Sequence, residues 1–269
     1  MSSSEPTLPS SLRLTVMGSG TSMGVPTVGC PCRVCHSSDP HDNRTRPSVL
    51  LSRGGQHVII DTTPDFRFQA LREKLDRLDA IVFTHPHADH ILGFDDIRPF
   101  NLRQKSALPV YASAETLAVL KRTFAYAFTD EPAVSTIPRV ILHVIEGPFE
   151  LLGMLWRPVA AEHGYMKVLG FRVGSMAYLT DFSRIPAESK ALLEGVDDLV
   201  IDALRDEPHP MHQTVAQALE LVKELQPRRA WFTHIAHDLP HRETNERLLR
   251  EGFSNVQLAY DGLSFEVRA

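Results

Sequence analysis

The chain has 269 residues, and 43% of them are hydrophobic, which allows one large domain or two small ones. Its formal net charge of −5 and its pI of about 6.2 exclude the basic excess that is typical of nucleic-acid-binding proteins. No stretch approaches the roughly 20 apolar residues that cross a bilayer, and the N-terminus lacks the pattern of a secretory signal. We therefore expect a cytoplasmic protein without a membrane partner and without stable nucleic-acid binding.

Residues 1–10 are rich in Ser and Pro and are expected to form a disordered N-terminal tail. After them we find neither a low-complexity linker nor an internal repeat. Residues 11–269 are therefore expected to form a single domain.

Secondary structure is predicted from the spacing of apolar residues along the chain. Short apolar, β-branched runs predict strands at Leu12–Gly18, Val49–Arg53, His57–Asp61, Ala80–Thr84, Val110–Ala112, Val140–Ile145, Leu169–Val173, Ala177–Thr180, Leu199–Asp202, Ala230–Thr233, Val256–Ala259 and Leu263–Val267. Helical periodicity predicts helices at Phe66–Leu75, Ala114–Phe128, Ala187–Glu194, Val215–Leu225 and Glu243–Glu251. Pro186 stands at a predicted helix start.

Two dipeptides, Gly174-Ser175 and Asp261-Gly262, separate neighbouring strand runs and predict β-hairpins. Hairpins exclude a purely parallel sheet, whereas the alternation of strands and helices favours an α/β protein. Two mixed β-sheets flanked by helices satisfy both observations.

The three cysteines, Cys30, Cys32 and Cys35, lie within six residues, and the sequence has no other cysteine. Such a cluster is a poor disulfide framework and a good metal-binding motif. Three thiolates at this spacing can occupy three corners of a tetrahedral zinc site. We choose His237 as the fourth ligand over His36, because two adjacent residues, Cys35 and His36, have an unfavourable geometry for binding the same metal. The competing interpretation is three unliganded thiols.

The Gly-rich stretch 18–26 precedes the cysteines and resembles a dinucleotide-binding fingerprint. Pro26 and Pro31 argue against that function, because they deny the loop the helix whose N-terminus would hold a pyrophosphate. A tight loop that lines the active site is the preferred interpretation, with Thr21 and Ser22 as candidate contacts.

Three predicted strands run directly into a side chain that can bind a metal. Ala80–Thr84 leads to His85, Ala177–Thr180 to Asp181, and Ala230–Thr233 to His234. This arrangement predicts a site at the strand ends, where rigid strands position the ligands and loops surround them.

The first of these strand ends carries a dense cluster of ligands. His85, His87, Asp89 and His90 place three imidazoles and one carboxylate within six residues. Imidazole nitrogen and carboxylate oxygen suit zinc, iron or manganese, and one such loop can serve two metals. A polar surface loop with chance histidines is the alternative.

The His85-x-His87-x-Asp89-His90 motif resembles the HxHxDH signature of the metallo-β-lactamase superfamily. The resemblance implies an αββα sandwich with two metals at one edge. It assigns His85 and His87 to one metal, and Asp89 and His90 to the other. Three later residues match the rest of that site: His163 as third imidazole on the first metal, Asp181 as the bridge between the metals, and His234 on the second.

Together, the N-terminal strand, the Gly-rich stretch and the cysteine motif resemble the phosphodiesterases of the carbon–phosphorus lyase pathway. That resemblance implies a structural Zn²⁺ held by three cysteines and a later histidine. It also favours Mn²⁺ over Zn²⁺ as the two catalytic ions. A possible homodimer is left open.

The expected reaction is hydrolysis of a small anionic phosphodiester, with a cyclic ribose phosphate or nucleotide as the leading class. Two divalent metals, Asp89, Asp181 and a bridging hydroxide leave the site near +1 within a protein of net charge −5, which favours a small anion. By position, His212 matches a histidine near the leaving group of the phosphodiesterases, and we assign it as the general acid. A solvated histidine at a helix start is the competing interpretation. His209 is a neighbouring candidate, whereas His57, His143 and His241 are assigned to structural or surface positions.

Three alternatives share these ligands. A tRNA 3′-processing endoribonuclease normally carries a basic arm, for which we find no Gly/Lys-rich insertion. The chemistry of a thioester hydrolase does not require the cysteine motif. A non-catalytic accessory protein with a vestigial site is opposed by the complete ligand set.

Overall fold

The computed structural model describes residues 11–129 and 135–268, so the predicted tail at 1–10 lies outside the described residues. Strands form two seven-stranded mixed sheets. In spatial order, the first sheet contains β14 (Ser264–Arg268), β1 (Ser11–Gly18), β2 (Ser48–Arg53), β3 (Gln56–Ile60), β4 (Ala80–Val82), β5 (Leu108–Ala112) and β6 (Val140–Val144). The second contains β13 (Val256–Leu258), β12 (Arg229–Thr233), β11 (Asp198–Asp202), β10 (Met176–Leu179), β9 (Met166–Val173), β8 (Met154–His163) and β7 (Phe149–Leu151).

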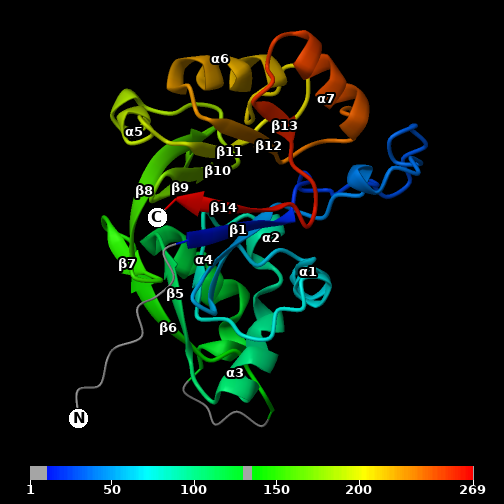
Figure 1. Cartoon of the computed structure of the whole chain (residues 1–269). Coiled ribbons are helices and arrows are strands. Elements are labelled where there is room, and N and C mark those ends of the chain that lie inside the picture. The colour runs from blue at the N-terminus through cyan, green and yellow to red at the C-terminus, as the bar shows by residue number, and fades with distance from the viewer. Residues whose placement is uncertain (1–10, 130–134, 269) are drawn as a thin grey trace.

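The sheets pack against each other, and helices cover their outer faces (Figure 1). The central apolar layer joins residues of both sheets, such as Val58 of β3 and Phe171 of β9. The first sheet is covered by α1 (Phe66–Arg72), α2 (Ala88–Ile91), α3 (Arg98–Gln104) and α4 (Ala114–Thr123). The second is covered by α5 (Ala187–Ala191), α6 (Val215–Leu225) and α7 (His241–Arg250). The expected αββα sandwich is therefore confirmed.

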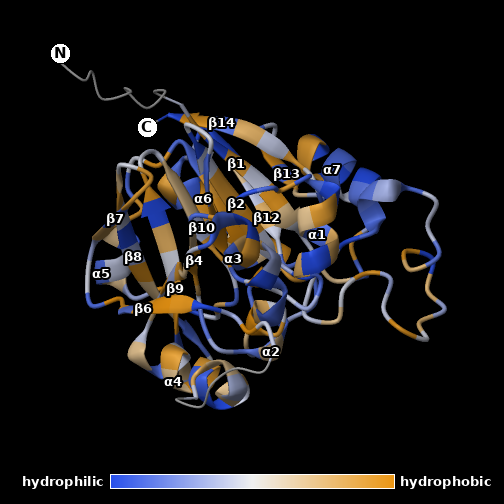
Figure 2. Ribbon diagram, turned by 90° about the horizontal axis from the view of Figure 1, so that it is seen from below, coloured by the Kyte–Doolittle hydropathy of each residue, from blue (hydrophilic) through white to orange (hydrophobic). Residues whose placement is uncertain are grey.

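Helices α1, α4 and α6 are held to the sheets by buried apolar residues on one side, and α1 and α7 carry both hydrophobic and hydrophilic residues in Figure 2. Helix α6 shows how its sequence sets its limits. Thr214 caps its N-terminus, because its side chain accepts a hydrogen bond from the Gln217 backbone N–H. In return, the Gln217 side chain accepts one from the Thr214 backbone N–H. Its last turn ends where Gln226 adopts a left-handed conformation with φ 49°. No helix within 11–129 and 135–268 is long and apolar enough to cross a membrane.

The twelve predicted strands and five predicted helices all occur, with boundaries that differ by a few residues. The structure also contains three 3₁₀ turns, at Pro40–Asp42, Phe94–Ile97 and Ala125–Ala127. The last of them lies within the predicted helix Ala114–Phe128, which ends as an α-helix at Thr123. Pro186 precedes α5 as its N-cap instead of opening it.

The sequence analysis missed two strands and two helices, β7, β8, α2 and α3. Strand β8 is ten residues long, and its burial alternates along the chain. Its polar outer face and Pro158 concealed it. The proline is tolerated because β7 pairs with β8 only from Met154 to Trp156, which leaves the backbone of Pro158 beyond that edge strand.

One predicted hairpin is wrong. Gly174-Ser175 does join the antiparallel strands β9 and β10, but Asp261-Gly262 links strands of different sheets. Strand β13 pairs in parallel with β12, and β14 pairs with β1. The Asp261 carboxylate accepts hydrogen bonds from the backbone N–H groups of Ser19 and Thr45, so it anchors a crossing between the sheets. An Asp-Gly dipeptide dictates a tight turn, but it does not dictate which strands pair.

Candidate metal centre

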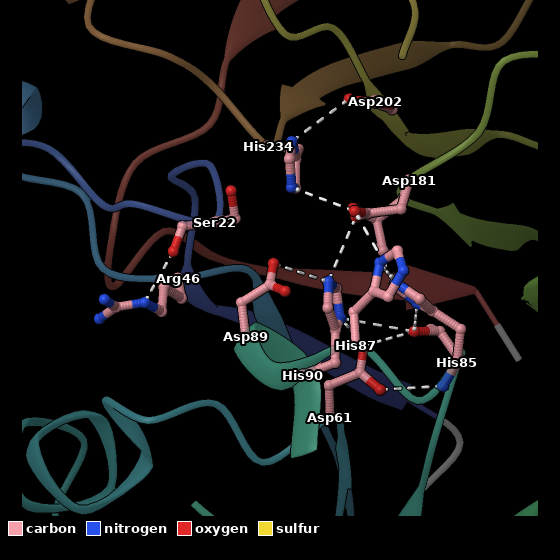
Figure 3. Close-up of polar contacts among 12 residues, drawn as sticks. Ser22, Arg46, Asp61, His85, His87, Asp89, His90, Asp181, Asp202 and His234 are labelled. Carbon is pink, nitrogen blue, oxygen red and sulfur yellow. Dashed lines mark hydrogen bonds and ion pairs between the residues drawn. The ribbon is translucent and has the colours of Figure 1, made fainter. Parts of the chain in front are cut away.

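Parallel strands from both sheets end at one edge of the sandwich, and the candidate ligands lie just beyond their carboxyl ends. In the second sheet, β10, β11 and β12 run in parallel and are followed or ended by Asp181, Asp202 and His234. In the first sheet, β3 and β4 are parallel and lead to Asp61 and His85. Since parallel strands bring their carboxyl ends together, residues far apart in sequence become neighbours here (Figure 3).

His85, His87 and His163 form the first ligand group, whose candidate ligand atoms lie within 4.8 Å of one another. His85 Nε2 lies 3.1 Å from His87 Nδ1. His163 ends strand β8, and its Nδ1 lies 2.9 Å from the backbone carbonyl of Met211. That carbonyl accepts a hydrogen bond only from a protonated Nδ1, which leaves Nε2 of His163 as a free ligand atom.

Asp89, His90, Asp181 and His234 form the second ligand group, within the same 4.8 Å limit. His90 Nε2 lies 3.2 Å from Asp89 Oδ2 and 3.4 Å from Asp181 Oδ1. The other oxygen of Asp181, Oδ2, lies 3.2 Å from His234 Nε2 and 3.9 Å from His85 Nε2. Asp181 thus faces both groups, which is the position needed by a bridging ligand.

Three residues at these strand ends have left-handed backbone conformations although they are not glycine. They are Asp61 with φ 68°, Asp181 with φ 55° and His234 with φ 59°. This region is uncommon for residues with a side chain and costs about 1–2 kcal/mol each. The conformation turns the chain sharply after each strand and leaves the side chain at the site. Strain of this kind, placed at three converging positions, is typical of functional sites.

Two buried carboxylates behind the ligands were not assigned any function from the sequence. Asp61 accepts a hydrogen bond from the Thr84 backbone at 2.8 Å, and its Oδ2 lies 2.7 Å from His90 Nδ1. Asp202 Oδ2 lies 3.0 Å from His212 Nδ1. Both follow the strand-end pattern that identified His85, Asp181 and His234, because each is the last residue of a predicted strand run. Applied to every strand, that pattern would have found them.

The buried ligand atoms fit the binding of divalent cations. Asp89 Oδ2, His90 Nε2 and both ring nitrogens of His234 are buried without a hydrogen-bond partner, which is unfavourable unless a ligand satisfies them. Burial by itself would lower the pKa of His90, but the carboxylates of Asp89, Asp181 and Asp61 outweigh it and raise that pKa well above the usual value. A site that stabilises a buried imidazolium so strongly is one that favours positive charge.

Cys30, Cys32, Cys35 and His237 form a separate group, again with candidate ligand atoms within 4.8 Å of one another. The Nδ1 atom of His237 lies 3.2, 3.7 and 3.3 Å from the Sγ atoms of Cys30, Cys32 and Cys35. The rival residue His36 is exposed and is not part of the group. Three thiolates and one imidazole are a typical donor set for structural zinc.

The loop that carries His237 is held by a buried arginine. The Arg44 side chain is fully buried and pairs with Asp42 at 2.9 Å. Its guanidinium donates hydrogen bonds to the carbonyls of Ala236 at 3.0 Å and Leu239 at 2.7 Å. Since His234 lies only two residues before Ala236, these contacts of Arg44 support both candidate metal sites.

The Gly-rich stretch packs against that loop, and no α-helix lies between it and β2. Thr21 N–H donates to the Ile235 carbonyl at 3.1 Å, and Ile235 N–H donates to Ser19 at 2.9 Å. Thr21 is buried, whereas Ser22 is exposed and its carbonyl accepts a hydrogen bond from Arg46 (Figure 3). Of the two candidate contacts, only Ser22 is available to a ligand.

His212 lies beside the second ligand group. Its ring stacks on that of His234 at 4.5 Å between centroids and lies 4.8 Å from the ring of His163. The centroid of the His209 ring lies 5.0 Å from that of the His212 ring. His57, His143 and His241 belong to none of the ligand groups found among the described residues.

A family model described as a β-lactamase superfamily domain matches residues 56–235. A solved structure of a diphosphatase from the PhnP family is 49% identical, with a TM-score of 0.87, and the match covers 96% of this chain and 99% of that one. The Zn²⁺-bound PqqB of Methylobacterium extorquens shares the fold, with a TM-score of 0.74 at 19% identity over 94% of this chain and 99% of that one.

An octanoyltransferase of Porphyromonas gingivalis is 37% identical over 94% of this chain, but the chain spans only 51% of that protein. A coenzyme PQQ synthesis protein B of Rhodopseudomonas palustris is 29% identical over 47% of this chain and 44% of its own length. The chain thus spans about half the length of these curated relatives. The match to the superfamily model and the near-complete match to the solved relative show that this chain belongs to the β-lactamase superfamily and, within it, to the PhnP family.

Proposed function

We propose that this hydrolase cleaves a small anionic phosphodiester with two divalent cations, and that a cyclic ribose phosphate or a 2′,3′-cyclic nucleotide is the leading substrate class. The observation that carries the proposal is Asp181, whose two carboxylate oxygens face His90 on one side and His234 and His85 on the other. A carboxylate shared by two ligand groups supports a two-metal site.

The chain's own residues supply binding and proton transfer. His85, His87 and His163 would hold one cation, and Asp89, His90 and His234 the other, with Asp181 between them. When bound, two such cations lower the pKa of water towards about 7 and neutralise charge that develops on the phosphate. Asp61 orients His90, and the Met211 carbonyl orients His163.

The leaving oxygen needs a proton, and His212 is placed to donate it. Its Nδ1 is engaged by Asp202, so the opposite ring nitrogen is available for proton transfer. The ring lies against both His163 and His234, within the ligand cluster. A positioned general acid contributes about 10²–10⁴-fold to the rate.

A second candidate is cleavage of a substituted diphosphate, because the relative at 49% identity is a diphosphatase. Both reactions place an attacking water opposite a phosphate-bound leaving group, so the same ligands and the same general acid would serve. Processing of tRNA is less favoured, since the Ribonuclease Z of Bradyrhizobium sp. (strain ORS 278) matches only 35% of this chain and 33% of its own length.

The test is a substrate panel with manganese-loaded protein and, in parallel, zinc-loaded protein. It contains a ribose 1,2-cyclic phosphate, a 2′,3′-cyclic nucleotide, a nucleoside diphosphate sugar, bis(4-nitrophenyl) phosphate, a thioester and a tRNA precursor. We expect the cyclic diesters to show the highest kcat/KM. Preference for the diphosphate would select the second candidate, and preference for the tRNA precursor or the thioester would overturn the proposal.

A further inference from the structure

One buried carboxylate faces two neighbouring imidazoles of the site. Asp202 is the last residue of β11, which lies between β10 and β12, and its side chain is fully buried. Its Oδ2 lies 3.0 Å from His212 Nδ1, and its Oδ1 lies 3.8 Å from His234 Nδ1 (Figure 3 shows the second pair). The carboxylate therefore has one oxygen for each ring.

The two rings are nearly parallel, with an interplanar angle of 16° and centroids 4.5 Å apart. In an imidazole, Nε2 lies across the ring from Nδ1. Because both Nδ1 atoms are turned to Asp202, both Nε2 atoms are turned away from it. For His234, that direction leads to Asp181, 3.2 Å from Nε2. The stacked ring of His212 consequently presents its Nε2 on the same side, beside the candidate cations.

The hydrogen bond to Asp202 also determines which nitrogen of His212 carries hydrogen. An ionised carboxylate only accepts, so Nδ1 of His212 must donate. That leaves Nε2 as the atom that gains and loses a proton. An imidazole without this partner is free to rotate and to move its hydrogen between the two nitrogens, so Nε2 is no longer held towards the site.

We infer that Asp202 is a positioning residue, which holds His212 as proton donor in register with the ligand His234. The inference rests on the proposed function. In the step concerned, water adds to phosphorus while the bond from phosphorus to the leaving oxygen breaks. The electron pair of that bond stays on the oxygen, which takes the proton from His212 Nε2. The proton lost by the attacking water returns the ring to its charged form or passes to solvent.

Asp202→Asn is the variant that tests this, because asparagine keeps the shape but presents only one accepting oxygen. Asp198→Asn is the matched control: Asp198 is equally buried at the other end of β11, where it pairs with Arg229 away from the site. His212→Ala and the double variant Asp202→Asn/His212→Ala complete a cycle. Each is assayed on a diester with an alkoxide leaving group and on bis(4-nitrophenyl) phosphate, whose leaving group needs little protonation.

We expect Asp202→Asn to lower kcat on the alkoxide diester by about 10²-fold, within the range of a general acid, and to stay much nearer wild type on the nitrophenyl diester. The double variant should be no slower than His212→Ala, and Asp198→Asn should match wild type on both substrates. Equal losses on both substrates, or additive losses in the double variant, would show that Asp202 acts only through folding or metal retention.

A second readout is independent of turnover. In zinc-loaded wild-type protein, ¹⁵N NMR of the His212 ring should show hydrogen on Nδ1, and Asp202→Asn should change that signature. A neutral ring with hydrogen only on Nε2 in the wild type would overturn the inference. If the wild type hydrolysed no diester at all, the proposed function would fail, whereas the NMR result would still decide the relationship between Asp202 and His212.

Discussion

Oδ2 of Asp61 lies 2.7 Å from Nδ1 of His90, and both side chains are fully buried. The same carboxylate accepts hydrogen bonds from the Thr84 backbone and hydroxyl. Asp61 therefore joins the end of β3 to the loop after β4 and to helix α2. The histidine is oriented by a residue 29 positions earlier in the chain, so the geometry of the second ligand group depends on the pairing of β3 with β4.

Asp61→Asn should weaken metal binding at the second ligand group by about 10–100-fold, as is typical when a carboxylate behind a histidine ligand is lost. Asparagine tolerates the left-handed backbone at this position, so the fold should survive. Competition with a chelator measures the affinity. Asp198→Asn, which removes a buried carboxylate far from the site, should leave the affinity unchanged; an equal effect of the two variants would refute the role of Asp61.

Protein purified without chelator should contain close to three metal ions per chain. Two are expected from the two ligand groups around Asp181, and one from the cysteine group. Elemental analysis checks the total. Saturation of the wild type at a single metal would contradict the assignment of the two groups around Asp181.

Cys32→Ser should release zinc and lower the melting temperature, because binding at a structural site contributes directly to folding free energy. The measurement combines zinc content with thermal unfolding. His36→Ala is the control, since His36 is exposed and outside the ligand group. Unchanged zinc content and melting temperature in Cys32→Ser would contradict the cysteine site, and loss of zinc from His36→Ala would show that the fourth ligand is assigned wrongly.

Gly93→Ala should destabilise the protein by about 1–3 kcal/mol, the usual cost of forcing extra volume into a packed region. A Cβ atom there would overlap the backbone carbonyl of Thr63, which cannot move aside as a flexible side chain can. Gly93 follows the short helix that carries Asp89 and His90, so metal content should fall as well. Denaturant unfolding and metal analysis test this. Gly147→Ala, at a glycine with open space around it, should be neutral.

The stability of the protein should depend on the ionisation of His241 at acid pH. Burial, together with the nearby His41, lowers the pKa of His241 from 6.5 to about 4. The folded state then binds fewer protons than the unfolded state below pH 6.5, so the stabilisation present above that pH is lost as the pH falls towards 4. His241→Gln keeps an acceptor for the Asn245 side chain but cannot become charged.

Melting temperatures between pH 4.5 and 7.5 should therefore fall more steeply with decreasing pH in the wild type than in His241→Gln. His36→Gln, at an exposed position, should follow the wild type. Parallel profiles of wild type and His241→Gln would show that His241 does not contribute to acid sensitivity.

Local features of this protein were determined by the sequence alone. The spacing of His85, His87, Asp89 and His90, and that of the three cysteines, places ligands on single loops, so no long-range contact is needed to recognise them. Strand and helix periodicity likewise depends on near neighbours, which is why two mixed sheets flanked by helices could be predicted. Strand β8 was missed because its burial alternates behind a polar face and a proline.

The partners that lie far apart in sequence were decided only by tertiary structure. Asp202 meets His212 and His234 because β10, β11 and β12 pair in parallel and end side by side. The Asp261-Gly262 turn joins two sheets because its carboxylate finds donors at Ser19 and Thr45, more than 200 residues earlier. Such contacts depend on which strands pair and on which donors each buried carboxylate can reach, and no local pattern of residues specifies either.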